Sequence, residues 1–143
     1  MFNKILVPFD NGEKAHKALD TAIELAKKFN SEITILTSFD MSRFTLQLSY
    51  TSLGREIDER FHKDTEAVVN DAVEKVRKEG IEVKAEIIKD NPGEAIVKYA
   101  EKEGIGLITM GSNNRGTVDR MFFGSVSYFV LHNAHCAVLV IKE

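Results

Sequence analysis

Two observations predict an α/β fold with a five-stranded, mostly parallel sheet and helices on both faces. Short apolar runs alternate with segments of helical periodicity along the whole 143-residue chain. Glycine, asparagine and proline stand between these segments, where turns and helix caps are expected. Alternation of this kind implies parallel strands that are joined by right-handed crossovers.

The first half of the chain contains two expected strands, one helix and a loop. Lys4 to Phe9 is an apolar run that ends at a turn signal, and it predicts a strand. Glu13 to Phe29 carries alanine, leucine and isoleucine at helical spacing. Glu32 to Phe39 alternates isoleucine with threonine, as a strand would. Asp40 to Arg55 has no clear period, so we expect a long loop, and such loops are often functional or mobile.

The middle of the chain predicts a long helix, a strand and a shorter helix. Glu56 to Glu79 has a broad apolar stripe, and Gly80 stands where a C-cap glycine belongs. Ile81 to Lys89 alternates apolar and charged residues, which is typical of a half-buried or edge strand. Asn91 suits an N-cap because proline follows it, and the helix is expected to run to about Glu103.

The last third predicts two more strands around a glycine-bearing loop. Ile105 to Met110 is apolar and indicates a buried strand. A polar loop follows from Gly111, and a helix is expected from about Gly124 to Asn133. Ala137 to Ile141 is the final strand. We find no linker or repeat, so residues 1–143 are expected to form a single domain.

Composition narrows the function classes. The formal net charge of −3 argues weakly against nucleic acid as a partner, since such domains usually have a basic face. The single cysteine, Cys136, fits a reducing compartment. No apolar run approaches the roughly 18 residues that cross a bilayer, and the N-terminus does not fit a signal peptide. We therefore expect a cytoplasmic, soluble protein.

The segment around the fourth strand predicts an anion-binding site. It reads Met110-Gly-Ser-Asn-Asn-Arg-Gly116 and is followed by Gly124-Ser-Val-Ser127 at an expected helix start. Glycine lets the backbone approach a ligand, and free N–H groups at a helix N-terminus attract negative charge. Arg115 is well suited to phosphate. The alternative is a structural turn with a serine N-cap, which needs no ligand.

Several motifs together resemble the universal stress protein family over nearly the whole chain. They are Lys4-Ile-Leu-Val-Pro-Phe-Asp10, Asn91-Pro-Gly-Glu-Ala-Ile96, Leu107-Ile-Thr-Met-Gly-Ser112, Gly124-Ser-Val-Ser127 and Cys136-Ala-Val-Leu-Val-Ile141. The resemblance implies a Rossmann-like fold of the adenine nucleotide alpha hydrolase-like type. It also implies a stress-response or signalling module that binds ATP, with Mg²⁺ held through the phosphates.

The resemblance also implies which residues would bind the nucleotide. They are Pro8, Phe9, Asp10, Ser38, Phe39, Met110, Gly111, Asn113, Asn114, Arg115, Gly116, Gly124, Ser125, Val126 and Ser127. Asp10 would contact the ribose or a bound metal, and an Asx-turn or N-cap is the compatible alternative. Pro8 and Phe9 would line the adenine side, whereas Ser127 could equally be plain helix surface.

One position departs from the motif of the nucleotide-binding subgroup. Gly111 and Gly124-Ser125 have the family's spacing, but Asn114 stands where the motif has its middle glycine. Asparagine is the best substitute for glycine if that position needs a positive φ. If the position needs the absence of a side chain, Asn114 crowds the phosphate. The alternative is therefore a dimeric family member that does not bind nucleotide.

Other chemistries find little support in the sequence. There is no glycine-x-serine-x-glycine elbow and no P-loop, so we expect no enzyme beyond slow, incidental ATP hydrolysis. A phospho-acceptor receiver domain would need a second acidic residue beside Asp10, where Asn11 stands. The four histidines show no metal-ligand spacing, so no metal site is expected in the protein itself.

The last strand predicts a homodimer. Its residues Ala137, Val138, Leu139, Val140 and Ile141 are all apolar. An exposed edge of this kind invites pairing with a second copy. We therefore expect an antiparallel contact between the final strands of two chains.

Overall fold

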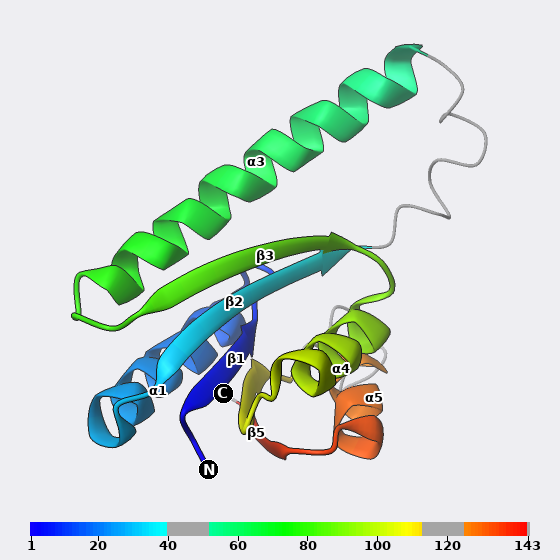
Figure 1. The fold of residues 1–143 in the computed structure, drawn as a ribbon. Helices are drawn as coiled ribbons and strands as arrows, with labels where there is room; N and C mark the ends of the chain where they lie inside the picture. Colours follow the sequence, from blue (N-terminus) through cyan, green and yellow to red (C-terminus); the bar gives the residue numbers. More distant parts are fainter. Residues whose placement is uncertain (40–51, 113–124, 143) are drawn as a thin grey trace.

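The computed structural model describes residues 1–39, 52–112 and 125–142 (Figure 1). Its elements are β1 (Lys4–Pro8), α1 (Glu13–Phe29), β2 (Glu32–Phe39), α3 (Ser52–Arg77), β3 (Val83–Lys89), α4 (Pro92–Glu103), β4 (Leu107–Gly111), α5 (Ser125–Asn133) and β5 (Ala137–Ile141). Within the described ranges the strands form one sheet in the order β3-β2-β1-β4-β5. Every neighbouring pair is parallel, which confirms the predicted fold class.

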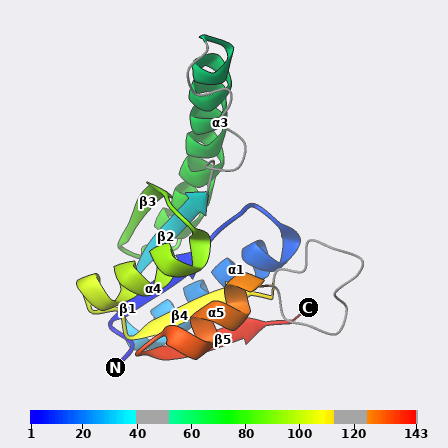
Figure 2. The same ribbon diagram turned by 90° about the vertical axis from the view of Figure 1, so that its right-hand side faces the viewer.

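The helices cover the two faces of the sheet in pairs (Figure 2). Helices α1 and α3 pack on one face, around buried residues that include Ile5, Leu19 and Ile35. Helices α4 and α5 pack on the other face, around Leu6 and Ile108. Consecutive strand residues therefore supply opposite layers, as the twofold repeat of a strand requires. In the described ranges, no helix is long and apolar enough to cross a membrane.

The helix boundaries follow from local chemistry that the sequence already shows. Asn30 ends α1 with φ +55°, and Gly104 ends α4 with φ +65°, so both adopt the left-handed conformation of a C-cap. At the start of α4 the Asn91 side chain accepts a hydrogen bond from the backbone N–H of Glu94, at 3.4 Å. Pro92 then occupies the first helical position. The N-cap and proline prediction is confirmed.

The long helix α3 starts earlier than the sequence pattern predicted. Residues 52–55 are helical, so the prediction of a loop there is wrong, while residues 40–51 lie outside the described ranges. The helix extends because Leu53, Ile57 and Phe61 continue its apolar spacing of four residues. In Figure 1 this end of α3 projects past the sheet. Leu53 is accordingly 57% exposed.

Thr109 provides a stability test inside the sheet. It is fully buried on β4, and its hydroxyl has no hydrogen-bond partner. We expect Thr109→Val to raise the free energy of unfolding by about 1 kcal/mol, because valine removes an unsatisfied buried group without leaving a hole. Thr34 is just as buried but is hydrogen-bonded to Tyr99, so Thr34→Val should lower stability instead. Urea titration of both variants compares them directly, and a loss of stability in Thr109→Val would contradict the expectation.

Candidate functional site

The parallel sheet brings the ends of β1, β2 and β4 to one edge. Strand β1 lies between β2 and β4. The chain continues from β1 to β2 and β3 on one side, and later adds β4 and β5 on the other side, so the strand order reverses at β1. Ligands of open α/β sheets bind at such a point, beyond the carboxyl ends of the strands. The predicted meeting of the Asp10 turn, the Phe39 end of β2 and the segment from Gly111 is confirmed for the described residues.

Hydrogen bonds hold the strand ends together at this edge. The Thr37 hydroxyl at the end of β2 donates to the carbonyl oxygen of Phe9, at 2.8 Å. The backbone N–H of Ser112 donates to the carbonyl oxygen of Ile141, at 2.9 Å. Residues just beyond β1 and β4 are thus fixed to the neighbouring strands, and the edge offers a defined backbone surface.

Asp10 forms the turn between β1 and α1. Its Oδ1 accepts a hydrogen bond from the backbone N–H of Gly12, at 2.9 Å, which confirms the Asx-turn. Gly12 is the N-cap of α1, so Asp10 does not cap the helix itself. Asn11 between them has φ +65°. Asp10 is exposed, and its role toward a ligand stays a prediction.

Two of the predicted site residues belong to the core. Phe9 is 3% exposed and packs in the α1 and α3 layer, where its ring meets the His16 ring edge to face at 5.0 Å. Met110 is equally buried, in the α4 and α5 layer. A ring contact between Phe9 and adenine would require that ring to leave the core. Pro8 and Ser38 are half-buried at the edge itself.

The end of β4 packs closely against the first turn of α1. A Cβ added to Gly111 would lie 2.7 Å from Lys14 Cβ and 2.9 Å from the Lys14 carbonyl carbon. Lys14 Nζ in turn donates to Ser112 Oγ, at 3.2 Å. Glycine at this position therefore serves helix–strand packing. Sequence reasoning missed Lys14, although a cation in the first turn of a helix was a usable signal because it opposes the helix dipole.

Helix α5 presents its first residues to the same edge. Ser125 is the first helical residue and is exposed. The first backbone N–H groups of a helix have no partner within the helix itself. Val126 packs partly into the α4 and α5 layer. Ser127 is fully buried, so the alternative of plain helix surface is wrong for it. Five further predicted site residues, Asn113, Asn114, Arg115, Gly116 and Gly124, lie outside the described ranges.

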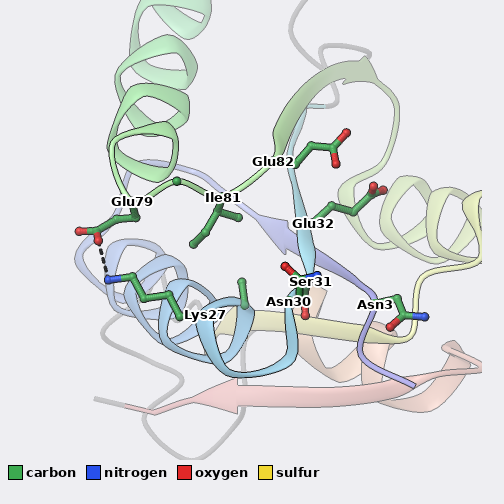
Figure 3. A pocket seen from close by; sticks show the side chains of 10 residues that line it. Asn3, Lys27, Asn30, Ser31, Glu32, Glu79, Ile81 and Glu82 are labelled. Carbon is green, nitrogen blue, oxygen red and sulfur yellow. Dashed lines mark ion pairs between the residues drawn. The ribbon is translucent and has the colours of Figure 1, made fainter.

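A hollow of about 460 Å³ lies at the opposite, amino-terminal end of the sheet (Figure 3). Its lining includes Glu32, Glu82 and Glu79, and Lys27 pairs with Glu79 at 2.5 Å. Sequence reasoning did not predict it. Parallel sheets bind ligands at the other end, beyond the carboxyl ends of the strands, where the Asp10 turn follows β1. The hollow is therefore no part of the candidate site.

The histidines and the cysteine add no reactive centre to the described part of the chain. Among those residues, no group of three histidine, cysteine, aspartate or glutamate side chains is arranged to hold a metal ion. Burial raises the pKa of the Cys136 thiol, so the thiolate that would react is disfavoured near neutral pH. Cys136 packs partly into the α4 and α5 layer.

The chain matches a known protein family over nearly its whole length. The family model described as the Universal stress protein family matches residues 1–142. The chain belongs to the universal stress protein family. The family resemblance predicted from the sequence motifs is thus confirmed.

Individual family members resemble the chain over its full length. Universal stress protein MJ0531 of Methanocaldococcus jannaschii is 29% identical and is covered to 84% of its own length. The solved structure of protein MJ0577, from the same organism, is 28% identical with a TM-score of 0.87, and 97% of it is covered. A universal stress protein from Archaeoglobus fulgidus was solved in complex with dAMP. It is 24% identical with a TM-score of 0.71, covers 99% of this chain and is itself fully covered.

Proposed function

We propose that this universal stress protein binds an adenine nucleotide, and specifically ATP, at the carboxyl edge of the sheet between β1 and β4. The observation that carries the proposal is that two features suited to phosphate follow the carboxyl ends of β1 and β4. The exposed N-terminus of α5 offers backbone N–H groups at Ser125. The Lys14 ammonium lies against Ser112 at the end of β4. Amide donors and a cation together suit phosphate.

The chemistry of the edge fits the polar parts of ATP. Exposed Asp10 follows β1 and offers a carboxylate to a ribose hydroxyl or to Mg²⁺ held by the phosphates. The half-buried Ser38 is the last residue but one of β2, on the side where the adenine is expected. A family member with the same fold that holds dAMP supports this choice of nucleotide base. When bound, Mg²⁺ would neutralise phosphate charge.

We further propose that the protein acts as a homodimer whose partner interactions depend on nucleotide occupancy. Strand β5 is an edge of the sheet, and Leu139 on it is 36% exposed. Pairing with a second β5 would cover that open edge. The second candidate function is that of a dimeric stress-response protein that does not bind nucleotide. It is favoured by Asn114, which stands where the motif has a glycine. The proposed activity is binding rather than catalysis.

The test is a thermal shift with ATP and Mg²⁺ on the wild type and on Ser125→Glu. A ligand at 100 times its dissociation constant adds about 2.7 kcal/mol, which raises the melting temperature of a chain of this size by roughly 8 °C. Ser125→Glu places a negative charge where the phosphate would lie and should abolish the shift. The fold should persist, because an acidic residue suits the first turn of a helix.

Ser125→Thr is the matched control, since it keeps the hydroxyl and should keep the shift. A wild type whose melting temperature does not move at millimolar ATP would favour the nucleotide-free alternative. A full shift in Ser125→Glu would place the ligand elsewhere on the molecule. Mass spectrometry of the purified wild type adds an independent readout, because a co-purified nucleotide would identify the base.

A further inference from the structure

The first turn of α1 contains a cation where the helix itself disfavours one. Lys14 is the second residue of α1, and a positive charge near a helix N-terminus opposes the dipole. Two other lysines of this helix, Lys27 and Lys28, stand in its last turn, where cations are favourable. Positions that break a local rule in an otherwise consistent fold are often functional.

The Lys14 side chain crosses the point where the chain order of the sheet reverses. Its Nζ donates to Ser112 Oγ at 3.2 Å, which joins the helix after β1 to the residue after β4. These residues are 98 positions apart in the sequence. The close approach of Gly111 to the Lys14 backbone keeps the two segments in this arrangement. The ammonium is therefore held at the end of the sheet where folds of this strand order bind their ligands.

Among the described residues, Lys14 forms no ion pair with a carboxylate. Its hydrogen-bond partner is a neutral hydroxyl, and within the described ranges no carboxylate lies within 4.0 Å of it. Lys17, one turn further along, is instead paired with Glu13 at 3.5 Å. Lys14 is half-buried, Ser112 is 5% exposed, and an ammonium carries three donors. A half-buried ammonium with this environment suits an anionic ligand.

We propose that Lys14 sets the preference of the site for nucleotides with more phosphates. This inference rests on the proposed function and adds a residue to it. The ammonium contacts the phosphate chain at a point that ATP reaches and AMP does not, while Ser112 positions it. Affinity therefore rises from AMP through ADP to ATP, and the ATP preference is sensitive to salt because it is carried by charge.

Isothermal titration with AMP, ADP and ATP, each with Mg²⁺, tests the proposal on the full chain. Lys14→Met keeps most of the length of the side chain without its charge, and should weaken ATP binding about tenfold while changing AMP binding less than about twofold. Lys14→Arg should retain the preference. Lys17→Met is the matched control on the same helix and should leave all three affinities unchanged. In the wild type, the ratio of ATP to AMP affinity should fall at high salt.

The outcomes separate this proposal from the one on which it rests. If the wild type binds no nucleotide at millimolar concentration, nucleotide binding itself fails and the role of Lys14 falls with it. If the wild type binds but Lys14→Met weakens AMP and ATP equally, Lys14 is only a structural tie. A salt-independent ATP preference in the wild type would also overturn the proposal, and this test needs no variant. If Lys14→Met does not fold, Lys14→Gln provides a second uncharged variant.

Discussion

Replacing Val140 with proline is expected to turn the proposed dimer into monomers without unfolding the chain. The carbonyl of Ile141 accepts a hydrogen bond from Ser112, so the polar backbone groups of Ile141 face β4. These groups alternate sides along a strand, which places the N–H of Val140 at the open edge of the sheet. Proline removes that donor, and edge strands tolerate it when the lost N–H faces outward. Sedimentation velocity at fixed protein concentration measures the change.

The matched control is Ile141→Pro, one residue further along the same strand. Its N–H faces β4, so proline there should disturb the sheet and lower the melting temperature. A charge at Val140 would be a poorer test, since this side chain packs against the α4 and α5 layer and a buried glutamate would destabilise the monomer. A Val140→Pro variant that sediments like a dimeric wild type would refute the β5 contact. A monomeric wild type would refute the dimer itself.

The fold was predictable because its determinants are local. An apolar or alternating run of residues indicates each strand. The helical spacing of apolar residues and the capping residues indicate each helix. Asn30, Asn91 and Gly104 mark helix ends in the sequence and occupy those caps in the structure. The start of α3 was missed because Leu53 continues the apolar stripe of α3 through a segment that is otherwise polar and mixed.

The sequence predicted the location of the candidate site but not its side-chain contacts. Parallel strands fix which ends share an edge, so the meeting of the β1, β2 and β4 ends followed from the order of elements. The contact between Lys14 and Ser112 did not follow, because it depends on how α1 packs against β4. The burial of individual site residues could not be predicted from the sequence either. Phe9 and Ser127 stand in ligand-binding motifs of the family, yet both side chains are buried in this structure.

Leu19→Ala and Leu53→Ala make the same chemical change in two helices, and we expect very different results. Leu19 of α1 is fully buried against the sheet, so removing it should cost 2–5 kcal/mol through lost burial and the cavity left behind. For a chain of this size that is roughly a 10 °C fall in melting temperature. Leu53 of α3 is 57% exposed, and its change should stay within about 0.5 kcal/mol.

Alanine is the best helix former, so neither variant is penalised by helix propensity and the comparison isolates burial. Urea titration at a single protein concentration gives both values and keeps the contribution of the proposed dimerisation the same for both variants. The near-neutral result matters as much as the large one, because it tests whether the projecting end of α3 contributes to the stability of the folded domain. A loss above about 2 kcal/mol for Leu53→Ala would mean that Leu53 is covered in the folded protein. That end of α3 would then be a packed part of the fold.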